Sequence, residues 1–161
     1  MRFVLVDRIL GLEPGRAIEV VKNVSATEDV FDDHFPGCPI FPGSLIVGIF
    51  EQSVELLIGT THASATVARL ERVSRAAFRH FVRPGDQLHI RCERVGGDTT
   101  RWSVRASARV GETIVADATL DFRLEAATTS ADHAERSARI QALARELRET
   151  PLALTGRSDV R

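Results

Sequence analysis

A histidine placed just before a proline-rich segment and a helix start is the part of this sequence best suited to chemistry. His34 is followed by three prolines and two glycines within nine residues, in the run HFPGCPIFPG. Each proline fixes φ at about −65° and removes a backbone donor, so we expect a rigid, extended loop that holds His34 in place. Gly43 then begins a helix whose first N–H groups lack backbone partners and carry the positive end of the helix dipole. A fixed imidazole beside such N–H groups offers a general base and an oxyanion site.

The segment that follows the loop is predicted to be one buried helix, from Gly43 to about Ile58. Apolar side chains cover much of its circumference, which is typical of a core helix. They are Leu45, Ile46, Ile49, Phe50, Val54, Leu57 and Ile58. Gly59 is expected to end the helix.

Alternating apolar and polar residues predict strands on both sides of this helix. Residues 3–8 and 16–23 are expected to form a hairpin around a turn at 13–15. Later strands are predicted over 66–82, 87–95, 99–110 and 112–124, separated by glycine-containing turns. Strands segregated around a single helix indicate an α+β fold, with a mostly antiparallel sheet wrapped around that helix.

The composition changes after residue 124, which divides the chain into a domain over 1–124 and a linker with a C-terminal helix and tail over 125–161. A narrow apolar stripe runs along the predicted helix, formed by Ala134, Ala138, Leu143 and Leu147. Two interpretations remain open for this helix. It packs on its own domain or a dimer mate, or it docks another protein.

Length and composition are those of one soluble globular domain with an extension. The chain has 161 residues, 43% hydrophobic and 27% charged, with a net charge of −1, so nothing indicates nucleic acid or a membrane surface as a partner. Cys38 and Cys92 are too few for a disulfide framework, and the N-terminus lacks the apolar region of a signal peptide. The scattered histidines lack metal-ligand spacing. We therefore expect a cytoplasmic protein with no membrane insertion, metal or cofactor.

The run HFPGCPIFPG at 34–43 resembles the signature of the 3-hydroxyacyl-[acyl carrier protein] dehydratases of fatty-acid synthesis, the FabZ type. The segments LVDRILGLEPG at 5–15, KNVS at 22–25 and FRHFVRPGDQL at 78–88 resemble that family in the same order. The likeness covers residues 3–124. It implies the hotdog fold, a curved antiparallel sheet around one long helix, usually assembled as dimers that join their sheets.

The resemblance also implies a role for each part of the motif. His34 would remove the α-proton of a thioester, and the Gly43 N–H would bind the thioester oxygen. A helix carboxylate from the other subunit would protonate the departing 3-hydroxyl as water. Phe35 and Pro42 are expected to contact the substrate.

This sequence departs from the family at the acid, which falls fourteen residues after the histidine and is Gly48 here. Gln52 keeps the register, and both residues are expected to line the substrate site. Glu51 is the first candidate replacement, because it lies about 60° round the helix and about 4.5 Å along it, with a side chain that leans back toward the preceding turn. Asp33 is the second, although its position favours orienting the imidazole. Whether either residue replaces the acid stays open.

The predicted reaction is dehydration of a (3R)-3-hydroxyacyl thioester to the trans-2-enoyl thioester, in fatty-acid, polyketide or related lipid synthesis. The expected partners are an acyl carrier protein with a phosphopantetheine-linked chain and a second copy of the protein, in a homodimer or a dimer-based higher oligomer. Two alternatives remain: a hotdog thioesterase, and a non-catalytic hotdog partner subunit that lacks the acid.

Overall fold

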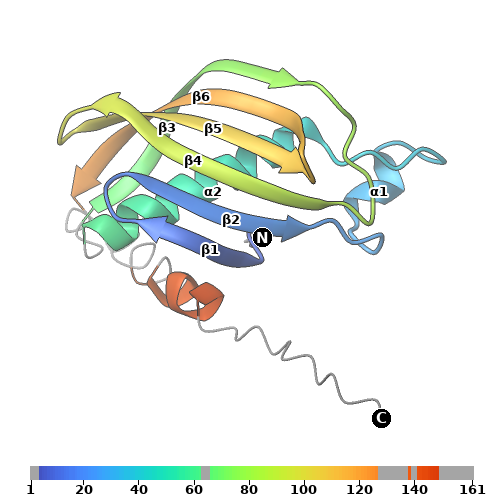
Figure 1. Cartoon of the computed structure of the whole chain (residues 1–161), viewed down its shortest axis with the longest axis horizontal. Helices are drawn as coiled ribbons and strands as arrows, with labels where there is room; N and C mark the ends of the chain where they lie inside the picture. The colour runs from blue at the N-terminus through green and yellow to red at the C-terminus, as the bar shows by residue number, and fades with distance from the viewer. Residues whose placement is uncertain (1–3, 63–65, 127–137, 139–140, 149–161) are drawn as a thin grey trace, which may run out of the picture.

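One six-stranded antiparallel sheet curves around a long central helix, as Figure 1 shows. The computed structural model describes residues 4–62, 66–126, 138 and 141–148. The strands are β1 (Arg8–Glu13), β2 (Ala17–Asn23), β3 (Thr66–Phe78), β4 (Gln87–Gly97), β5 (Arg101–Val110) and β6 (Thr113–Ala126), and the helices are α1 (Val30–Asp33) and α2 (Gly43–Thr61). This arrangement confirms the predicted α+β hotdog fold.

The strand order is β1-β2-β4-β5-β6-β3, and each strand pairs antiparallel with its neighbours. The hairpins β4–β5 and β5–β6 follow the chain directly, whereas β3 reaches the far edge after α2 has crossed the sheet. The β4–β5 turn requires glycine, because Gly97 has φ of +100° and a Cβ there would lie 2.0 Å from the Arg101 carbonyl oxygen. Among the described strands, β3 lies at the edge and pairs only with β6, and most of its later residues are exposed.

Helix α2 packs its apolar side against the sheet and forms the centre of the core. Ile49, Phe50 and Val54 are fully buried and contact apolar residues of the sheet strands. By length and composition α2 could cross a membrane, but half of its most apolar window is buried inside the domain. The opposite face is half-buried and carries Gly48, Glu51, Gln52 and Glu55. The helix is therefore apolar toward the sheet and largely polar on its open side.

The predicted helix end at Gly59 is wrong, because α2 continues to Thr61. Gly59 is itself buried, and the hydroxyls of Thr60 and Thr61 donate to the Leu56 and Leu57 carbonyl oxygens at 2.7 and 2.6 Å. These bonds satisfy acceptors of the last turn, so the glycine does not have to end the helix.

The first predicted strand was placed too early. It runs over Arg8–Glu13, while residues 4–7 lie beside α2, with the backbone N–H groups of Leu5 and Val6 bound to Gln52. β3 also ends at Phe78, four residues before the predicted end, and the short helix α1 was not predicted. An apolar segment such as 3–8 can form either a strand or an extended segment that packs along a helix. The alternation of residues alone does not distinguish these two structures.

A C-terminal helix over residues 141–148 packs beside the β1–β2 hairpin (Figure 1). Leu147 is 6% exposed and Ala144 is 4% exposed, and both belong to the hydrophobic core. Of the predicted stripe, Leu143 is half-buried, Ala138 is exposed and Ala134 lies outside the described residues. The helix thus packs on its own domain, which is the first of the two interpretations.

Candidate active site

His34 follows α1 directly and is held at both its backbone and its ring. Its N–H donates to the Val30 carbonyl oxygen at 3.0 Å, and its ring Nδ1 lies 2.8 Å from the Ile40 carbonyl oxygen. A carbonyl only accepts, so Nδ1 is the protonated nitrogen of the neutral ring and Nε2 keeps its lone pair. The side chain is therefore set in the tautomer that a general base needs.

The loop after His34 is compact rather than extended throughout. The Cys38 N–H donates to the Phe35 carbonyl oxygen at 2.9 Å, and the Ile40 N–H donates to the His34 carbonyl oxygen at 3.3 Å. Phe35 is 54% exposed, and its ring stacks on the imidazole with centroids 4.3 Å apart. The predicted extended course is wrong for this part of the loop, because a tight turn between the prolines folds the chain back toward the histidine.

Pro42 and Gly43 form the start of α2, as predicted. Pro42 is buried and precedes the helix without a side-chain cap, and its carbonyl oxygen accepts from Leu45 at 3.0 Å and Ile46 at 3.2 Å. The N–H groups of Gly43 and Ser44 come before these and have no acceptor in the helix ladder. They are the donors available to an oxyanion.

Phe78 explains why the helix begins with glycine, and sequence reasoning missed it. A Cβ on Gly43 would lie 2.8 Å from the Phe78 ring atom Cε1. Phe78 ends β3, and its ring, although the residue is 53% exposed, packs against Gly43 at the helix start. No local signal in the sequence marked this contact, because the predicted strand ran on to residue 82 and did not end at Phe78.

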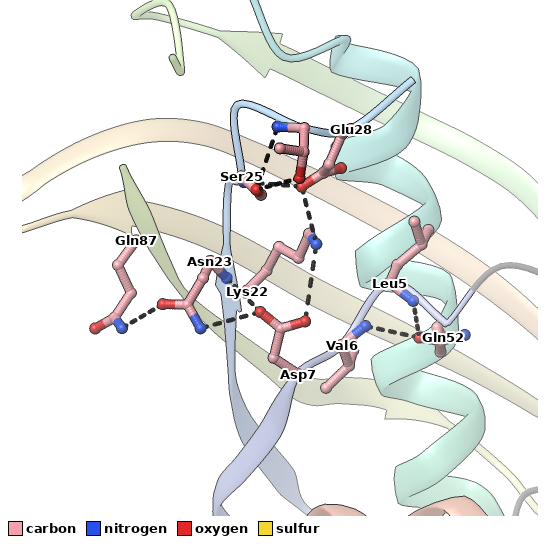
Figure 2. Close-up of polar contacts among 10 residues, drawn as sticks. Leu5, Val6, Asp7, Lys22, Asn23, Ser25, Glu28, Gln52 and Gln87 are labelled. Carbon is pink, nitrogen blue, oxygen red and sulfur yellow. Dashed lines mark hydrogen bonds and ion pairs between the residues drawn. The ribbon is translucent and has the colours of Figure 1, made fainter. Parts of the chain in front are cut away.

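Gly48 lies on the open face of α2, where the N-terminal segment passes. A Cβ on Gly48 would lie 3.0 Å from Leu5 Cδ1. One turn further along, the Gln52 Oε1 accepts from the Leu5 and Val6 N–H groups at 2.8 and 2.9 Å (Figure 2). The space beside Gly48 is thus occupied by Leu5, and the Gln52 amide oxygen binds backbone.

The two candidate acids differ in their surroundings. Glu51 is half-buried on the open face of α2, within one turn of Gly48, and its carboxylate forms no ion pair with a described residue. Asp33 is exposed at the end of α1, and the group that orients the imidazole is the Ile40 carbonyl rather than this carboxylate. In the described part of the chain, no group of three or more His, Cys, Asp or Glu side chains is placed to hold a metal ion.

A curved antiparallel sheet around one helix, with a histidine loop leading into the helix N-terminus, defines a hotdog-fold protein of the dehydratase type. The FabA-like domain model matches residues 1–119, and the chain belongs to that family.

Curated relatives that this chain resembles include two named 3-hydroxyacyl-[acyl-carrier-protein] dehydratase FabZ. The one from Symbiobacterium thermophilum is 41% identical over 128 residues, covering 79% of this chain and 90% of the relative. The one from Thioalkalivibrio sulfidiphilus is 38% identical over 125 residues, covering 73% of this chain and 84% of the relative. Among solved structures, smu.793 from Streptococcus mutans bound to acetyl CoA superimposes with a TM-score of 0.62 at 18% identity, covering 78% of this chain and 94% of that one.

Proposed function

We propose that this protein dehydrates a (3R)-3-hydroxyacyl thioester, carried by an acyl carrier protein, to the trans-2-enoyl thioester. The reaction would serve fatty-acid, polyketide or related lipid synthesis in the cytoplasm. The supporting observation is the His34 imidazole, whose Nε2 is free to accept a proton, in a loop that leads into the α2 N-terminus. Membership of the FabA-like family and relatives named as dehydratases give this arrangement its reaction class.

In this reaction Nε2 of His34 removes the proton from C2 of the acyl chain. The thioester oxygen gains negative charge and is bound by the Gly43 N–H at the positive end of the α2 dipole. The bond between C3 and its hydroxyl oxygen then breaks, and the hydroxyl leaves as water with a proton from a carboxylic acid. We assign that acid to Glu51 of the partner subunit's α2, with Phe35 and Pro42 beside the substrate. Gly48 and Gln52 instead contact residues 5 and 6 of their own chain.

The exposed edge strand β3 supports a dimer in which two copies join their sheets. An edge strand of thirteen residues presents unpaired N–H and C=O groups along one side, which suits pairing with a second copy. Joining two β3 strands would extend the sheet and bring the open faces of the two α2 helices toward each other. Analytical ultracentrifugation of the full chain tests this; a monomer at micromolar concentration would contradict the dimer.

The deciding experiment offers the purified protein 3-hydroxyacyl thioesters of several chain lengths, on acyl carrier protein and on coenzyme A. Formation of the enoyl thioester, followed by mass, supports dehydration, whereas release of free thiol indicates thioester hydrolysis. His34→Asn should lower kcat by about 10²-fold or more. His89→Asn is the matched control, because that imidazole lies on β4 and bonds to Gln87. If no product of either kind forms, the chain is a non-catalytic partner and the proposal fails.

A further inference from the structure

The only lysine of the chain joins the segment that carries His34 to the segment that covers Gly48. Lys22 lies at the end of β2 and is 9% exposed. Its Nζ lies 3.1 Å from Glu28 Oε1 and 3.7 Å from Asp7 Oδ1. Figure 2 shows Lys22 between these two carboxylates. A nearly buried ammonium between two carboxylates is costly to form unless the pairing is specific. The two carboxylates belong to the two segments that flank the candidate site.

Glu28 connects Lys22 to His34 through the backbone of the turn before α1. The Glu28 carboxylate accepts from the Ser25 N–H at 3.1 Å, and its carbonyl oxygen accepts from the Phe31 N–H at 3.0 Å. α1 then runs to Asp33, and the His34 N–H bonds to the Val30 carbonyl oxygen. The backbone of His34 is therefore held by a short helix that has no fully buried residue. Two contacts hold that helix: the partly buried Phe31 packs against the core, and Glu28 bonds to its start.

Asp7 connects Lys22 to α2 through the N-terminal segment. Its Oδ2 accepts from the Asn23 backbone N–H at 2.6 Å, and its own N–H donates to the Val21 carbonyl oxygen at 2.9 Å. Leu5 lies two residues before it, held on α2 by Gln52 and packed beside Gly48. The Lys22 ammonium is therefore also paired with the N-terminal segment, residues 4–7, which packs beside Gly48 and Gln52 on α2.

We propose that Lys22 is a positioning residue, which sets the His34 loop relative to the open face of α2 through Glu28 and Asp7. The inference rests on the proposed role of His34 as base. Lys22 itself does not touch the reacting atoms. Its ion pairs hold the turn before α1 and the N-terminal segment, residues 4–7, at a fixed separation. Proton transfer from C2 depends on the resulting position of His34 relative to α2.

The test compares Lys22→Met with the neutral triple variant Lys22→Met, Asp7→Asn, Glu28→Gln. Lys22→Met leaves two carboxylates without their cation, so both stability and positioning should suffer, and kcat should fall by about 10-fold to 100-fold with KM little changed. The triple variant removes the uncompensated charge and should regain thermal stability, while kcat stays low. If the triple variant regains full kcat, Lys22 serves only to neutralise the Asp7 and Glu28 carboxylates, and the proposal is overturned.

A readout independent of turnover is the Cε1–Hε1 NMR cross-peak of His34, identified by its loss in His34→Asn. The peak should shift or broaden in Lys22→Met and in the triple variant. It should be unchanged in Arg16→Met, which breaks an ion pair of 2.7 Å with Glu13 at the β1–β2 turn. An unchanged peak in a folded Lys22→Met protein would refute the inference. If the unchanged chain forms no enoyl product, the proposed function fails, and this spectrum still decides the positioning role.

Discussion

Leu5 packs against the Cα of Gly48, so that a Cβ added there would come within 3.0 Å of Leu5 Cδ1. Position 48, where the sequence resemblance predicts that an acid is missing, is therefore covered by the chain's own N-terminal segment. This relationship gives a stability prediction. Gly48→Ala gains about 1 kcal/mol of helix propensity, but it has to displace Leu5, so the net change should be small.

Shortening the Leu5 side chain should allow the helix propensity of alanine at position 48 to stabilise the protein. In a Leu5→Ala background, Gly48→Ala should stabilise the protein by about 1 kcal/mol, as measured by urea unfolding in a double-mutant cycle. An equal effect of Gly48→Ala in both backgrounds would show that Leu5 does not restrict this position.

Two isosteric substitutions compare Glu51 and Asp33 as candidates for the proposed acid. Glu51→Gln should lower kcat by about 10²-fold, because an amide cannot protonate the departing hydroxyl. Asp33→Asn should leave kcat close to that of the unchanged chain, because the Ile40 carbonyl orients His34. Steady-state assays with one 3-hydroxyacyl substrate compare the two variants. Loss of turnover in Asp33→Asn alone would transfer the acid role to that residue.

The start of α2 should be intolerant of any side chain. Gly43→Ala places a Cβ 2.8 Å from the Phe78 ring, so the ring or the helix start has to move. We expect a loss of about 1 to 3 kcal/mol in the free energy of unfolding. We also expect a fall in kcat, since the Gly43 N–H that we propose binds the oxyanion would shift. Phe78→Ala in the same chain should restore most of the stability. If Gly43→Ala alone is as stable as the unchanged chain, the Phe78 ring can move aside without loss of stability, and the prediction is wrong.

Acid should weaken the attachment of the edge strand β3. Ser103 and Ser74 donate hydrogen bonds to the Asp121 carboxylate at 2.6 and 2.7 Å, and these bonds lower its pKa from the ordinary value, Ser103 having the larger effect. A folded-state pKa below the unfolded one contributes stability above the unfolded pKa, and that contribution is lost as the pH falls through the folded pKa.

Unfolding free energies measured from about pH 5 down to about pH 2 should therefore fall less steeply for Asp121→Asn than for the unchanged chain. The matched control is Glu112→Gln, an exposed carboxylate in the β5–β6 turn. If the unfolding free energy falls equally steeply with pH in the unchanged chain and in Asp121→Asn, Asp121 does not contribute to the loss of stability in acid.

Much of the fold followed from local patterns in the sequence. Alternation placed β4 and β6 to within two residues at each end, and the proline loop with its apolar helix located His34 and Gly43. The histidine tautomer was beyond such reasoning, because it depends on the Ile40 carbonyl returning to the ring across a turn. Patterns report which residues are buried, whereas hydrogen-bond partners depend on how the chain folds back.

The errors share a physical cause, which is that tertiary contacts override a local signal. Gly59 is a helix terminator by propensity, but it is buried and followed by threonines that bond to the last turn. The segment before Arg8 resembles a strand, yet Gln52 binds its N–H groups from α2. Leu5 and Phe78 were missed for the same reason, since their contacts with glycines lie far away in the sequence.

The C-terminal helix has a consequence for the order in which the domain can be completed during synthesis. Ala144 and Leu147 supply part of the core, although they follow all six strands in the chain. A nascent chain that has released β6 still exposes the apolar surface that these residues cover. The domain therefore reaches its final burial only after residue 147 has left the ribosome, and a premature stop before that point would yield a protein with an incompletely covered core.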